Sequence, residues 1–221
     1  MLRRCPTSDR RAADAWDRLA ARYGAQERLE TRAVDAALRL AVSAPAERLV
    51  DLATGTGLVL RRLAVMPARP RIAIGVDSSA RMLARVGALP AGWSTSRADA
   101  RRVPLPSAWA DVVVCSYLLQ LLEPAERAGV LAEARRLLRP AQTARLVTVT
   151  VWADESGARG RLLSRALSGA ARARPAAWGG LRPLDPTRDL TAAGFAVTRR
   201  VVVPRRGYPS LVLAAGPARG G

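Results

Sequence analysis

The chain has 221 residues, 49% of them hydrophobic, and a formal net charge of +18. Its length suits one domain with a sizeable core. Its longest apolar stretch, residues 112–122, is too short for a membrane helix of about 20 residues, and no signal-peptide pattern precedes it, so we expect a cytoplasmic protein. The absence of histidine excludes an imidazole base or ligand, two cysteines cannot form a zinc cluster, and we expect no metal.

The N-terminal part, residues 9–42, is predicted to be helical, with an interruption at Gly24. Trp16, Leu19, Ala20 and Tyr23 follow the spacing of one helix face. We expect residues 1–47 to form a helical cap on a domain of residues 48–221.

From Arg48 onward, short apolar runs alternate with stretches of helical character. Strands are predicted at residues 48–52, 72–76, 93–98, 111–116 and 144–151, and helices at 57–65, 79–87 and 124–138. A short helix at 189–193 and strands at 195–203 and 210–214 follow, the two strands forming an antiparallel pair. The alternation predicts an α/β fold with a doubly wound, mostly parallel, Rossmann-like sheet of seven strands. Residues 153–183 fit no core strand and are predicted to be an insertion beside the site.

Three acidic residues stand at the carboxyl ends of the first three predicted strands. Asp51 ends the first strand, and Gly55 and Gly57 stand in the turn after it; Asp77 and Asp99 follow the second and third strands. Glycine permits a ligand to approach the backbone closely, and an acid after the second strand can bind a ribose. Ligands of such sheets bind at the carboxyl ends of the strands, so these residues are candidates for a nucleoside site.

The same residues distinguish two classes of nucleoside ligand. Dinucleotide-binding domains have the pattern GxGxxG, whereas Leu60 occupies the position of the third glycine. Asp51 would repel a pyrophosphate but attract an ammonium group. The pattern therefore favours a nucleoside that carries an amino acid, and NAD is the main alternative.

Several motifs in order resemble class I S-adenosylmethionine-dependent methyltransferases, especially the ubiquinone/menaquinone-biosynthesis (methyltransferase type 11) group. LVDLATGTG resembles their first motif, IGVDSSARML their second, and RADARRVPLPSAWADVVVCSYLLQLL their third and fourth. WDRLAARY resembles their N-terminal helix, and LTAAGF the short helix before their C-terminal strand pair. The turn LRPAQTA departs from their usual LxPGG, and Gln120 stands where many relatives have histidine.

The resemblance implies S-adenosyl-L-methionine as cofactor and a methyltransferase activity (EC 2.1.1.-). The cofactor-binding residues that it implies are Tyr23, Asp51, Ala53, Thr54, Gly55, Gly57, Asp77, Ser78, Met82, Asp99, Ala100 and Ser116. No catalytic residue is identified; Tyr117, Gln120 and Tyr208 are the candidates. Purely structural roles remain open for some of these residues: Asp99 could serve only to cap a turn, and Tyr23 could serve only to pack in the core.

The predicted acceptor is a small molecule, such as a quinone, a polyketide or another secondary metabolite, methylated on O, N or C. RNA methylation and a non-catalytic, cofactor-binding scaffold are the alternatives. All 36 basic residues are arginine, with no lysine or asparagine, as a very GC-rich coding sequence would give, so we do not expect nucleic acid as partner. The arginines of residues 155–183 either form a solvated surface or give the acceptor site a positively charged entrance. Such an entrance would attract an anionic acceptor or an anionic membrane surface. A monomer or homodimer is expected.

Overall fold

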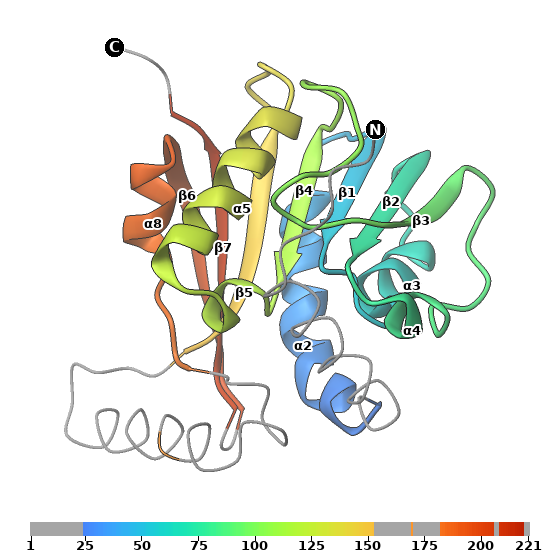
Figure 1. Ribbon diagram of the computed structural model, residues 1–221, viewed down its shortest axis with the longest axis horizontal. Helices are drawn as coiled ribbons and strands as arrows, with labels where there is room; N and C mark the ends of the chain where they lie inside the picture. The colour runs from blue at the N-terminus through green and yellow to red at the C-terminus, as the bar shows by residue number, and fades with distance from the viewer. Residues whose placement is uncertain (1–23, 153–168, 170–181, 206–207, 219–221) are drawn as a thin grey trace, which may run out of the picture.

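A seven-stranded mixed sheet forms the centre of the molecule (Figure 1). The computed structural model describes residues 24–152, 169, 182–205 and 208–218. The strands are β1 (Arg48–Leu52), β2 (Ile72–Asp77), β3 (Trp93–Arg97), β4 (Val112–Ser116), β5 (Arg145–Val151), β6 (Phe195–Val203) and β7 (Ser210–Pro217). Their spatial order is β3-β2-β1-β4-β5-β7-β6. The first five strands run parallel, and β7 is antiparallel to both of its neighbours.

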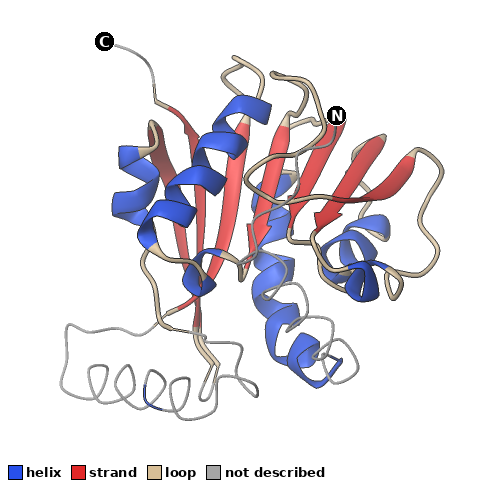
Figure 2. Ribbon diagram, in the orientation of Figure 1, coloured by secondary structure: helices blue, strands red, loops and turns tan. Residues whose placement is uncertain are grey.

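Helices cover both faces of this sheet (Figure 2). They are α2 (Gly24–Ala41), α3 (Leu58–Ala64), α4 (Ala80–Leu83), the 3-10 turn η2 (Leu119–Leu121), α5 (Pro124–Leu137) and α8 (Thr187–Ala192). Apolar residues of α2 and α3 form one buried cluster with the sheet, and those of α5 and α8 form a second on the opposite face. Because β5 lies between both clusters, all seven of its residues are buried, as is typical of a central strand.

The end of α2 is held against the sheet by a buried arginine. Arg145 at the start of β5 is 8% exposed, and its guanidinium donates hydrogen bonds to the carbonyl oxygens of Ala41 and Ala44. The last carbonyls of a helix have no partner within the helix, so this positive side chain supplies one and also complements the negative end of the helix dipole. The contact fixes α2 relative to the central strands.

The predicted doubly wound sheet with its C-terminal antiparallel pair is confirmed. Two boundaries differ by three residues or more: β7 continues to Pro217, and α4 ends at Leu83, short of residue 87. The other boundaries differ by at most two residues. None of the described helices combines the length and apolarity needed to cross a membrane. The predicted helix before Gly24 and the predicted insertion, apart from Gly169, Arg182 and Pro183, lie outside the described residues.

Candidate functional site

A cavity of about 170 Å³ lies at the carboxyl ends of β1, β2 and β4. It is lined by Ala53, Gly55, Asp77, Ser78, Met82, Ala98, Asp99, Ala100, Arg101, Ser116, Tyr117, Leu118, Leu121, Leu122, Glu126 and Val130. Eight of the predicted cofactor-binding residues are in this set: Ala53, Gly55, Asp77, Ser78, Met82, Asp99, Ala100 and Ser116. Residues at the ends of four strands, β1 to β4, therefore converge on one cavity.

The turn after β1 contains three residues with positive φ: Ala53 (57°), Gly55 (56°) and Gly57 (84°). A side chain at Gly55 would meet no other atom within 4 Å, so this glycine leaves open space beside the cavity. A Cβ at Gly57 would lie 2.8 Å from Val86 Cγ1. Gly57 does not line the cavity, and its backbone conformation and close packing explain the glycine there.

The glycine turn is tied to α2 by a charged cluster. Arg61 of α3 donates to both carboxylate oxygens of Glu27 at 2.9 Å. The Thr56 hydroxyl donates to Glu27 Oε1 as well, and Arg61 also bonds the Thr56 carbonyl. Thr54, between the glycines and β1, is buried, and its amide donates to the Val76 carbonyl of β2 at 2.9 Å. These contacts hold the turn in place, and Thr54 itself does not line the cavity.

Asp77, at the end of β2, organises two backbone segments. Its Oδ2 accepts a hydrogen bond from the Gly55 amide and its Oδ1 one from the Ser79 amide, both at 2.8 Å. Ser79 in turn caps α4, with its hydroxyl oxygen accepting from the Met82 amide at 3.1 Å. These two amides therefore fix the Asp77 carboxylate on the cavity wall.

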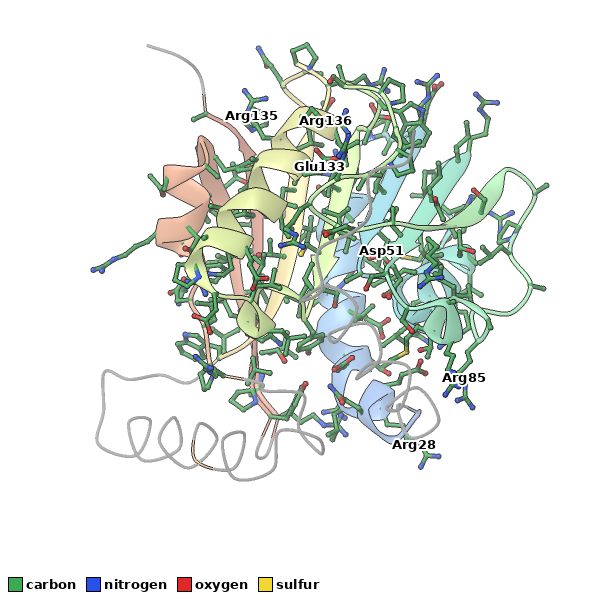
Figure 3. All side chains as sticks on the ribbon, in the orientation of Figure 1. Arg28, Asp51, Arg85, Glu133, Arg135 and Arg136 are labelled. Carbon is green, nitrogen blue, oxygen red and sulfur yellow. The ribbon has the colours of Figure 1, made fainter. Side chains whose placement is uncertain are left out.

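Asp51 lies on β1 at the centre of the molecule (Figure 3) and is completely buried. Neither carboxylate oxygen has a hydrogen-bond partner among the described residues. Burial raises its pKa to about 7; the nearby Thr54 hydroxyl lowers it and the Asp77 carboxylate raises it further. Asp51 does not line the cavity, whereas Ala53 and Gly55, which follow it in the sequence, do.

Asp99 is engaged by a neighbour that sequence reasoning missed. Its Oδ1 accepts from the Arg101 amide at 2.8 Å, and the Arg101 guanidinium bonds both carboxylate oxygens. Burial works to raise the pKa of Asp99, but the bonds from Arg101 outweigh it and hold the pKa below its usual range. Asp99 thus caps its own turn while it lines the cavity, and Arg101 also approaches Glu126 at 3.5 Å.

Two of the three catalytic candidates, Tyr117 and Tyr208, lie side by side, and the third, Gln120, lines a different cavity. Tyr117 lines the cavity, and its hydroxyl shares a 2.7 Å hydrogen bond with Ser210 Oγ. Tyr208 lies 5.8 Å from Tyr117, measured between ring centroids, and its hydroxyl donates to Glu30 Oε1. Gln120 lines a second cavity. Burial, and to a smaller extent the nearby Glu30 carboxylate, raises the pKa of Tyr117. The phenol therefore stays protonated: it can donate or accept hydrogen bonds, but it is a poor general base.

Glu30 was not among the predicted site residues. It is 3% exposed and accepts hydrogen bonds from Gln26 and Tyr208. Burial raises its pKa to about 7, against the lowering effect of these two bonds. In the sequence it is one acid on an amphipathic helix, so no local pattern singles it out. Tyr23, the remaining predicted residue, lies outside the described residues.

Comparison with known proteins relates this geometry to one family. Residues 49–141 match a family model described as a methyltransferase domain. The ubiquinone/menaquinone biosynthesis C-methyltransferase UbiE of Caulobacter vibrioides is 33% identical over 142 residues, which cover 57% of this chain and 55% of that protein. The match thus spans about half the length of this curated relative.

Solved structures show the same fold over most of the chain. A methyltransferase bound to the Trm112 activator of Haloferax volcanii has a TM-score of 0.69 at 19% identity, covering 95% of this chain and 99% of its own. The N-methyltransferase NodS of Bradyrhizobium japonicum, solved with S-adenosyl-L-homocysteine, has a TM-score of 0.65 at 12% identity, covering 86% and 88%. The chain therefore shares the Rossmann-like fold of these two proteins.

Proposed function

We propose that this chain is a class I S-adenosylmethionine-dependent methyltransferase, as the matched domain and the UbiE relative suggest, and that it binds S-adenosylmethionine at the cavity beside Asp77 and transfers its methyl group to a small molecule. The observation that carries the proposal is the convergence of Gly55, Asp77, Met82 and Asp99 on one cavity. The buried carboxylate of Asp51 lies on β1, the strand that leads into the glycine turn.

The described residues suit the parts of such a cofactor. Asp77 offers carboxylate oxygens already oriented by two amides, which suits the two hydroxyls of a ribose. Met82 supplies an apolar, polarisable side chain suited to a flat base. A buried carboxylate without a hydrogen bond is costly, and an ammonium group would satisfy Asp51. A dinucleotide brings no such group.

Bound S-adenosylmethionine would supply a methyl group on a positively charged sulfur. The task of the protein is then to align the acceptor with that methyl group and exclude water, which can lower a barrier by about 7–11 kcal/mol. Tyr117 stands on the cavity wall with its hydroxyl fixed by Ser210, and its raised pKa keeps it protonated. It therefore suits a positioning role better than that of a base.

For the acceptor, we propose a quinone-like or other ring-containing metabolite methylated on O, N or C. The name of the Caulobacter relative, a C-methyltransferase of ubiquinone/menaquinone biosynthesis, supports this class. Leu121 and Leu122 on the cavity wall suit a flat apolar ring.

Calorimetry with S-adenosylhomocysteine and with NAD tests the cofactor assignment. We expect the full chain to bind S-adenosylhomocysteine and not NAD, and the Asp77→Ala variant to lose this binding. Asp35→Ala is the matched control, because Asp35 pairs with Arg62 on the surface away from the cavity. Binding of NAD alone, or unchanged affinity in Asp77→Ala, would contradict the proposal.

Formation of S-adenosylhomocysteine from S-adenosylmethionine across a panel of quinols and phenols tests the reaction. Cofactor binding without turnover on any acceptor would instead favour a scaffold subunit. Turnover on RNA, with RNA binding that persists at high salt, would favour the nucleic-acid alternative.

A further inference from the structure

Two adjoining cavities meet at the 3-10 turn η2. The second cavity, of about 250 Å³, is lined by residues of η2, of the start of α5 and of segment 182–184. Leu121 and Leu122 line both cavities, so the two share a wall. The second cavity is therefore next to the site at which the proposed function places the cofactor.

Gln120 gives this second cavity an unusual polar group. The residue is only 4% exposed, yet neither its amide nitrogen nor its amide oxygen has a hydrogen-bond partner among the described residues. Leaving such a group buried and unpaired destabilises the folded protein, and native proteins keep few of them. A ligand that bonds both atoms would remove this cost.

The charges around the cavity determine which ligand suits it. Arg127 pairs with Asp189 at 3.1 Å and also donates to the Leu122 carbonyl. Arg182 approaches Glu123 at 3.8 Å. Both cations thus have carboxylate neighbours, so the cavity does not favour an anion. A neutral polar ligand suits it better.

We propose that Gln120 recognises the methyl acceptor through a neutral group that presents one hydrogen-bond donor and one hydrogen-bond acceptor side by side. A ring with hydroxyl groups on two adjacent carbons is such a group. A primary amide offers one acceptor and a pair of donors on neighbouring atoms, and the two ends can exchange places by a flip of the side chain. This inference rests on the proposed function, because it assigns the acceptor side of the same site.

The first measurement is the stability of Gln120→Leu without ligand. Leucine has nearly the same volume and no polar atom, so removing an unpaired amide should raise Tm by about 2–4 °C. Gln120→Met is the second variant, with a flexible side chain of similar length. A fall in Tm for both variants would show that the amide already has partners, and would overturn the proposal.

The second measurement is binding of two probes, 2,3-dihydroxynaphthalene and 2-naphthol, by ligand fluorescence with S-adenosylhomocysteine saturating. The wild type should bind the diol about tenfold more tightly than 2-naphthol, since the diol satisfies both amide atoms. Gln120→Leu should bind both about equally, with unchanged affinity for S-adenosylhomocysteine.

An equal preference for the diol in wild type and variant, or no binding of the diol to the wild type, would overturn the role of Gln120. The titrations are repeated without S-adenosylhomocysteine. Should S-adenosylhomocysteine itself fail to bind, the proposed function fails, while the ratio of the two probe affinities still decides whether Gln120 recognises the donor–acceptor pair.

Discussion

The Gly55 amide donates a 2.8 Å hydrogen bond to Asp77 Oδ2, joining the turn after β1 to the end of β2 across 22 residues of sequence. The other Asp77 oxygen accepts from Ser79 at the same distance. One carboxylate therefore fixes both the glycine turn and the entry to α4. The wall of the cavity is shaped by this residue before any ligand binds.

Substitution of Asp77 should consequently reduce stability as well as ligand binding. Asp77→Ala removes the acceptor of two amides, and hydrogen bonds to charged groups contribute about 1.5–3 kcal/mol. We expect a loss of this order in the free energy of unfolding, measured in urea. The surface variant Asp35→Ala should lose under about 1 kcal/mol; equal losses in the two variants would contradict an organising role for Asp77.

A set of glycine substitutions separates the cavity from the fold. Gly55, Gly57 and Gly194 all have positive φ, so each change to Ala should cost about 1–2 kcal/mol of unfolding free energy. Gly57→Ala should cost about 1–3 kcal/mol more, because its Cβ would crowd Val86. Urea denaturation measures these losses.

Only Gly55→Ala should also weaken S-adenosylhomocysteine binding beyond its effect on stability, because Gly55 lines the cavity and Gly194 does not. Combining Gly57→Ala with Val86→Ala should recover part of the stability lost in Gly57→Ala alone. No recovery in this pair would show that backbone strain, and not crowding, dominates at Gly57.

Sequence patterns predicted the sheet well because the buried strands β1, β2, β4 and β5 are short apolar runs followed by a turn or an acid. The run Ile72–Val76 ends at Asp77, and the structure ends β2 there as well. The carboxyl ends of parallel strands meet at one edge, and this brought Gly55, Asp77 and Asp99 to one cavity as expected.

Contacts made in three dimensions could not be predicted in the same way. Gly57 faces Val86, and Glu30 meets Tyr208 across 178 residues; neither pair has a local signature. Asp51 was expected at the site, but it does not line the cavity. Charge attraction was a sound argument for Asp51, yet it gave no information on how deep the carboxylate would be buried.

Glu30 should make stability depend on pH. Its pKa is raised from 4.5 to about 7 in the folded protein, so the folded state holds an extra proton between these values. The contribution of Glu30 to the wild-type free energy of unfolding is therefore highest at low pH and falls as the pH rises towards 7 and above. Glu30→Gln keeps an oxygen for Tyr208 but does not titrate. Its free energy of unfolding relative to wild type should therefore increase by about 2–3 kcal/mol from pH 4.5 to pH 8.

Urea denaturation of both proteins at pH 4.5, 6 and 8 measures this gain. Asp51 titrates in wild type and variant alike, so its contribution cancels in the difference. A difference that stays constant across the three pH values would show that Glu30 does not titrate in this range.

Asp51 should make cofactor binding depend on pH in the opposite direction. Its pKa is raised from 3.8 to about 7, and an ammonium group requires the ionised carboxylate. Below pH 7 the ligand must displace a proton, so the Kd for S-adenosylhomocysteine should rise about tenfold per unit of falling pH and level off above pH 7. Calorimetry between pH 5.5 and 8.5, in buffers of different ionisation enthalpy, measures both the affinity and the proton released. Asp51→Asn should bind more weakly and lose this pH dependence, whereas Glu30→Gln should retain it. A wild-type Kd that does not change over this range would show that Asp51 takes no part in binding the amino-acid end of the ligand.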